Sequence, residues 1–168
     1  LVGSEMCIRD RHCIGPIQSN KTRLVAEHFH WAHTVDRLKI AQRLSEQRPD
    51  HLPPLQVCIQ VNVDGGATKS GVTPQEALAL AQAVAQLPRL QLRGLMCIPE
   101  PAPDFVAACA VFSRGRALFD ALCKAGLPLD TLSMGMSADL DAAVSSGSTL
   151  VRVGTAIFGG RSYPAAVA

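Results

Sequence analysis

Six short apolar runs alternate with segments of helical period, and this alternation constrains the fold more than any other feature of the chain. The apolar runs lie at residues 12–18, 31–35, 55–63, 90–98, 131–134 and 150–153. Helices are predicted at residues 22–29, 37–47, 74–86, 101–125 and 138–146, with a last turn at 156–158. Strands that alternate with helices in this way are typical of βαβ units and a parallel sheet.

Two architectures fit this alternation: a (β/α)8 barrel and an open, doubly wound sheet. The last two apolar runs each end in glycine and a hydroxyl residue, at residues 135–137 and 154–155. Barrels often carry a phosphate site after their last two strands. We therefore predict an α/β barrel of the (β/α)8 TIM type that is incomplete here, with about six of eight βα units and the first two missing.

The glycine turns also predict an anion site. Glycine allows close approach of the backbone to a ligand, and a helix N-terminus directs unpaired N–H groups at it. Ser137, Gly154 and Thr155 lie in these turns, and Arg152 lies just before the second glycine. The alternative is that both are ordinary strand–helix turns in which Ser and Thr cap helices.

Two other helix starts have recognisable caps. Thr73 and Glu76 form a capping box around Pro74. Asp36 is expected to be the N-cap of the helix at residues 37–47.

Composition and charge exclude several classes of protein. The chain has 168 residues, a net charge of +2 and no basic block interleaved with aromatic residues, which argues against nucleic-acid binding. No apolar run reaches the length of a membrane span. The six cysteines lack metal-ligand spacing, so reduced thiols in the cytoplasm are expected.

Six ordered motifs closely resemble the pyridoxal phosphate homeostasis proteins, single-domain relatives of the alanine racemase barrel. The matching stretches are HCIGPIQSNK at 12–21, HTVDR at 33–37, residues 60–62 with 69–71, LRGLMCIP at 92–99, LSMGMSAD at 132–139 and VRVGTAIFG at 151–159. The resemblance implies a non-catalytic protein that binds and buffers pyridoxal 5′-phosphate (PLP) and supports vitamin B6 and amino-acid balance. It also implies PLP-dependent enzymes as acceptors of the cofactor.

Residue roles follow from the same resemblance. It implies that Ser137, Gly154 and Thr155 bind the phosphate and that Arg152 lies at the pyridine nitrogen. Met96 is expected near the ring. Asn20 is a further candidate on the cofactor face.

The chain departs from the family pattern at the lysine that holds PLP as a Schiff base, which follows the family's first strand in a stretch resembling Val-Ser-Lys-Thr. No such stretch occurs here. We therefore expect residues 1–11 to be a non-native leader and residues 12–168 to be a partial PLP-binding barrel domain. If this fragment held PLP covalently, Lys69 would be the first amine to test. The intact protein is expected to be a monomer, whereas the open edges of a partial barrel favour self-association.

Two rival functions remain. An amino-acid racemase or aldolase with this barrel is the first, and racemases typically need a tyrosine acid/base, for which Tyr163 is the only candidate. A phosphate-binding barrel enzyme without PLP is the second, with Asp64 or Glu100 as its catalytic carboxylate.

Overall fold

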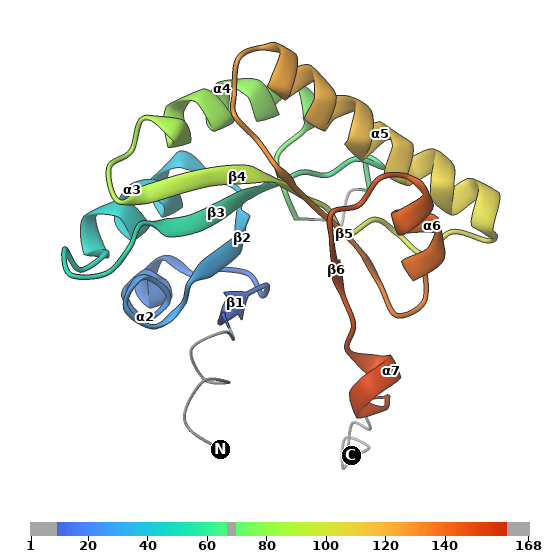
Figure 1. Cartoon of the computed structure of the whole chain (residues 1–168), viewed down its shortest axis with the longest axis horizontal. Coiled ribbons are helices and arrows are strands. Elements are labelled where there is room, and N and C mark those ends of the chain that lie inside the picture. The colour runs from blue at the N-terminus through green and yellow to red at the C-terminus, as the bar shows by residue number, and fades with distance from the viewer. Residues whose placement is uncertain (1–9, 67–69, 161–168) are drawn as a thin grey trace, which may run out of the picture.

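The computed structural model describes residues 10–66 and 70–160, and in them six strands form one curved parallel sheet (Figure 1). The strands are β1 (His12–Cys13), β2 (Trp31–Val35), β3 (Leu55–Gln60), β4 (Leu90–Met96), β5 (Thr131–Met136) and β6 (Leu150–Arg152). Their order in the sheet is their order in the sequence, and every neighbouring pair is parallel. The predicted strand–helix alternation is thus confirmed.

Helices connect successive strands and lie along the outer side of the sheet, and a last short helix, α7, follows β6 at its end (Figure 1). They are the 3-10 turn η1 (Ser19–Lys21), α2 (Thr22–His28), α3 (Leu38–Gln47), α4 (Pro74–Ala85), α5 (Phe105–Lys124), α6 (Leu140–Ser145) and α7 (Thr155–Phe158). Because each crossover carries a helix to the same side, the other side of the sheet is left for a site.

The outer face of the sheet forms the main core. Strand residues such as Val57, Ile59 and Leu132 are buried together with Leu44 of α3 and Phe112 of α5. Side chains alternate between the two faces of a strand, so the neighbouring residues of β3 face the inside of the curve.

A small second cluster lies apart from the main core and consists of Trp31, Cys58 and Met96. Polar side chains of the strands also meet here: His33 of β2 is hydrogen-bonded to Ser133 of β5. Because β2 and β5 are not neighbours in the sheet, this contact requires the sheet to curve around its inner face. One row of side chains along β3, which includes Cys58, therefore faces the inside of the curve.

Two glycines allow the tight curvature beside the site. At Gly94, with φ of +158°, a Cβ would lie 1.7 Å from the Thr131 carbonyl oxygen. At Gly135, with φ of +94°, it would lie 2.4 Å from the Cβ of Ala143. Any side chain at these positions would force β5 away from β4 or α6 away from β5.

The structure confirms one predicted helix cap and corrects the other. The capping box is present, with the Thr73 hydroxyl accepting from the backbone N–H of Glu76 and the Glu76 carboxylate accepting from that of Thr73. The prediction of Asp36 as N-cap is wrong. Arg37 has extended backbone angles and is the N-cap of α3, so the helix begins one residue later than Asp36 could cap. The Asp36 carboxylate lies 3.4 Å from the Arg37 guanidinium instead.

Candidate functional site

A cavity of about 820 Å³ opens at the carboxyl ends of β5 and β6. Its lining comes from the chain after β1, from the turn after β5 and from the segment at the end of β6. The lining residues are Ile14, 136–138, 152–155 and 158–160. Ile14 follows β1, so the two ends of the curved sheet contribute to one cavity. The carboxyl ends of the strands are where parallel α/β folds bind ligands.

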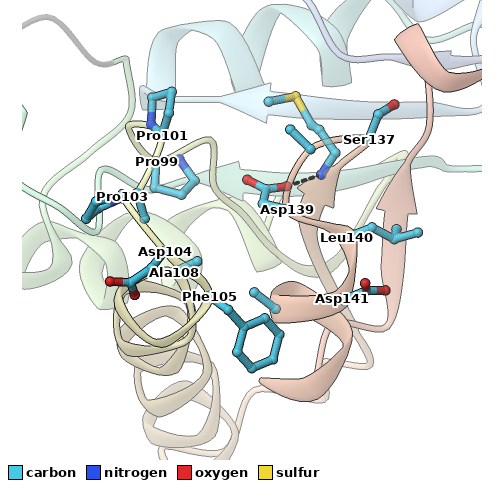
Figure 2. A pocket seen from close by; sticks show the side chains of 14 residues that line it. Pro99, Pro101, Pro103, Asp104, Phe105, Ala108, Ser137, Asp139, Leu140 and Asp141 are labelled. Atoms are coloured by element: carbon cyan, nitrogen blue, oxygen red, sulfur yellow. Dashed lines mark hydrogen bonds between the residues drawn. The ribbon is translucent and has the colours of Figure 1, made fainter.

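The Ser137 hydroxyl joins the two predicted glycine turns. Its oxygen accepts hydrogen bonds from the backbone N–H groups of Gly154 and Ala156, both at 3.2 Å. The turn that carries Ser137 is held by Asp139, whose carboxylate accepts from the Met136 N–H at 2.6 Å (Figure 2). Ser137, Gly154 and Thr155 are thereby brought together with several donors in one place, as an anion site requires.

Arg152 lies beside this group and is anchored by two of its three nitrogens. Nη1 donates to the Ser133 hydroxyl at 2.7 Å, and Nη2 donates to the Cys97 carbonyl oxygen at 2.9 Å. The third nitrogen, Nε, is buried and has no acceptor among the described residues. Burial lowers the pKa of Arg152, but a guanidinium remains charged at neutral pH. Nε is therefore the one nitrogen of this cation that has no partner among the described residues.

Two histidines complete the polar inner face. His33 Nδ1 lies 3.0 Å from Ser133 Oγ, and His33 Nε2 lies 2.9 Å from His12 Nδ1. Burial, followed by the charges of His12 and Arg152, lowers the pKa of His33 to about 4. Both imidazoles have hydrogen-bond partners, and their connection to Arg152 was not predicted.

The other two predicted site residues lie away from the cavity. Met96 is fully buried in the cluster with Trp31 and Cys58. Asn20 is exposed in η1, after β1. Neither lines the cavity, and their proposed contacts with the cofactor stay predictions.

A second cavity of about 490 Å³ lies on the other side of the Ser137 turn, between the starts of α5 and α6 (Figure 2). Residues 136–138 line both cavities. In Figure 2 the Ser137 side chain points away from Asp104 and Phe105, which lie on the far side of this second cavity. The Ser137 hydroxyl therefore belongs to the site of Arg152 and Gly154.

The groups invoked by the rival functions are partly accounted for. The Asp64 carboxylate accepts from the backbone N–H groups of Gly66 and Glu100, so it ties its loop to the end of β4. Lys69 and Tyr163 lie outside the described residues. Within residues 10–66 and 70–160, no group of three His, Cys, Asp or Glu side chains is placed to hold a metal ion. Among the helices that the structure describes, none has the length and apolar composition needed to cross a bilayer.

The thiols in the described part of the chain are free. Burial raises the pKa of both Cys58 and Cys97 to about 12. These two thiols are therefore unreactive core residues.

Comparison with protein families gives a match over nearly the whole chain. The model of the family described as alanine racemase, N-terminal domain, matches residues 7–162. The match starts at residue 7, inside the stretch 1–11 that is expected to be a non-native leader.

Individual proteins are also similar. The pyridoxal phosphate homeostasis protein of Pseudomonas aeruginosa is 64% identical over 154 residues, which are 92% of this chain and 66% of that protein. The protein of the same name from Escherichia coli is 55% identical over 152 residues, covering 90% and 65%. The chain thus spans slightly less than two thirds of the length of these curated relatives.

Solved structures show the same fold. Structures of PipY from Synechococcus elongatus without PLP and with PLP bound have TM-scores of 0.80 and 0.79 at 36% identity. They cover 88% of this chain and 70% and 69% of theirs. Alanine racemase of Clostridium difficile has a TM-score of 0.72 at 16% identity, over 92% of this chain and 40% of its own. The predicted fold, six βα units of an alanine racemase-type barrel, is confirmed.

Proposed function

The chain belongs to the alanine racemase N-terminal domain family, and within it to the pyridoxal phosphate homeostasis proteins; from that premise we propose that it binds PLP and serves as a non-catalytic carrier of this cofactor. PLP combines a phosphate with a pyridine ring, and the cavity at the ends of β5 and β6 offers a partner for each. The PLP-bound structure of PipY supports the choice of ligand.

The observation that carries the proposal is the buried Nε–H of Arg152, for which the described protein supplies no acceptor. Leaving a buried donor unpaired costs on the order of 1–3 kcal/mol, so such a group calls for a partner. An unprotonated pyridine nitrogen is a hydrogen-bond acceptor of the required kind. The residues present therefore fit the cofactor.

The phosphate has its own partners in the same cavity. The backbone N–H groups of Gly154 and Ala156 both donate to the Ser137 oxygen, and the Ser137 hydroxyl hydrogen is used in neither bond. A phosphate oxygen would accept from that hydroxyl and, in place of the Ser137 oxygen, from the two N–H groups, and Thr155 adds a hydroxyl at the start of α7.

Arg152 also bears on the absence of catalysis that we propose. When bound, PLP supplies an electron-withdrawing ring that stabilises carbanions. A guanidinium at the ring nitrogen keeps that nitrogen unprotonated, which weakens the ring as an electron sink. This supports a carrier that delivers PLP to cytoplasmic acceptor enzymes, and racemisation assays with amino acids should show no turnover.

The open edges of the sheet support self-association of this chain. Among the described strands, β1 and β6 each have a single neighbour, so one edge of each offers unpaired backbone groups. Ile157 and Phe158 in α7, beside β6, are 67% and 85% exposed. Sedimentation velocity across a range of concentrations tests this directly, and a constant monomer mass would contradict it.

A PLP titration with a matched pair of variants tests the function. Ser137→Ala removes the hydroxyl that joins the two turns, whereas Ser145→Ala removes an exposed hydroxyl at the end of α6. We expect Ser137→Ala to weaken PLP binding about tenfold, because a hydrogen bond to a charged phosphate is lost. Ser145→Ala should bind as the wild type does. Equal PLP affinity of Ser137→Ala and wild type, or no PLP binding by the wild type, would refute the proposal.

A further inference from the structure

A continuous line of polar atoms crosses the inner face of the sheet from β6 to β1. Arg152 Nη1 lies 2.7 Å from Ser133 Oγ, which lies 3.0 Å from His33 Nδ1. His33 Nε2 lies 2.9 Å from His12 Nδ1. Four strands contribute one residue each, and only the contact between β2 and β5 joins strands that are not neighbours in the sheet.

The chemistry of these groups gives the line a single direction. A guanidinium is donor only, so Arg152 donates to Ser133 Oγ. Ser133 Oγ has two lone pairs but one hydrogen, and among its described contacts only His33 Nδ1 can accept that hydrogen, so the arrangement that satisfies Ser133 leaves Nδ1 unprotonated. His33 therefore carries its hydrogen on Nε2 and donates it to His12 Nδ1. Because His12 accepts at Nδ1, its own hydrogen lies on Nε2.

The surroundings keep His33 neutral. It is fully buried, and the charge that faces it from β6 is the Arg152 guanidinium. On its β1 side it meets the His12 ring, which stacks on Trp31 and lies near Asp10 and His30. The Arg93 guanidinium of β4 lies over the other ring that contacts His33, that of Trp31. A protonated His33 would have to donate to Ser133 Oγ, would leave the Ser133 hydroxyl hydrogen without a described acceptor, and would add a second buried cation.

We propose that Ser133 and His33 are positioning residues for Arg152, which they hold through a one-way hydrogen-bond relay ending at His12. The relay occupies Nη1, the Cys97 carbonyl occupies Nη2, and Nε is thereby left as the nitrogen without an acceptor. That this nitrogen meets a pyridine ring rests on the proposed function, whereas the relay itself does not.

Two nearly isosteric substitutions at one position separate the relay from simple packing. In His33→Asn the amide oxygen can accept from Ser133 in place of Nδ1, whereas His33→Leu offers no acceptor. We expect His33→Leu to weaken PLP binding about tenfold and His33→Asn to weaken it less than about threefold. His51→Leu, at an exposed histidine, is the control and should have no effect. Equal losses in His33→Asn and His33→Leu would overturn the proposal.

The tautomers of the two histidines give a readout that needs no PLP. In nitrogen-15 NMR spectra of the wild-type chain near pH 8, both His12 and His33 should be Nε2–H tautomers, assigned by loss of each signal in His12→Gln and His33→Asn. An Nδ1–H tautomer at His33 would overturn the relay. If the wild type shows the expected tautomers but does not bind PLP, the proposed function fails and the relay stands.

Discussion

The two faces of the sheet are built from the same strands and have opposite chemistry. On the outer face Val57, Ile59 and Leu132 belong to one apolar cluster with residues of the covering helices. On the inner face His33 of β2 and Ser133 of β5 are as deeply buried, yet each is polar. Packing on the outer face holds the strands in place. Polar side chains on the inner face of those strands then hold Arg152.

This difference implies different sensitivities. An apolar face depends on volume, since each lost methyl group leaves a cavity in a close-packed core. A buried polar face depends on the protonation state and on every partner in the network, because one missing partner leaves another group unsatisfied. Substitutions and pH should therefore act on the two faces in different ways.

The largest effect is expected on the outer face. Phe112 in α5 is 1% exposed and is among the largest fully buried side chains of the described core. Phe112→Ala should lower the free energy of unfolding by about 3–5 kcal/mol, through lost transfer energy and a cavity. Urea unfolding followed by circular dichroism measures it. Phe158→Ala, at an 85% exposed position, is the control and should change stability little; equal effects would show that Phe112 does not pack as described.

The inner face should show the next largest effect, as a dependence of stability on pH. The pKa of His33 is lowered from 6.5 to about 4 in the folded chain. Between these values the unfolded chain takes up a proton that the folded chain does not. Stability is therefore fully present above pH 6.5 and falls as the pH drops to 4, by about 3 kcal/mol from this residue.

Comparing the wild type with His33→Asn isolates the contribution of His33 to the pH dependence of stability, because other groups also titrate. Urea unfolding at pH 7.5 and at pH 4 should show a smaller loss of stability for His33→Asn than for the wild type. The same loss in both proteins would mean that His33 is not held neutral by the fold.

The smallest effect on stability is expected from a backbone change at Gly126, which lies outside both faces of the sheet. Gly126 follows α5 with φ of +93°, and a Cβ there would meet no atom within 4 Å. Gly126→Ala should cost about 1 kcal/mol, from the left-handed backbone alone. Gly15→Ala, which also meets nothing within 4 Å but has no positive φ, should be nearly neutral in thermal melts. A neutral Gly126→Ala would show that this turn is not held in the left-handed region.

The outer face explains why so much of the fold could be predicted from the sequence. Alternation within residues 55–60 and the capping box at Thr73 are local patterns, and both appear in the structure. The error at Asp36 was also local: whether Asp36 or Arg37 takes the extended conformation depends on how the chain leaves β2. The first apolar run was predicted too long, because only His12 and Cys13 pair with β2.

The inner face could be predicted only in part. The glycine turns identified Ser137, Gly154 and Arg152, because turn chemistry is visible in a few adjacent residues. The relay joins residues as far apart as His33 and Ser133, 100 positions apart in the sequence. No spacing rule connects them, since they meet only when the sheet curves.

The central claim is that Arg152 Nε and the turn at Ser137 are two parts of one PLP site. Adding PLP to the nitrogen-15-labelled chain and following two sets of NMR signals tests it most directly. The account predicts that the Arg152 Nε–H signal, assigned by its loss in Arg152→Lys, shifts together with the backbone N–H signals of Gly154 and Ala156. Inorganic phosphate should shift only the backbone signals. Saturation with PLP that leaves the Arg152 Nε–H signal unmoved would contradict the account.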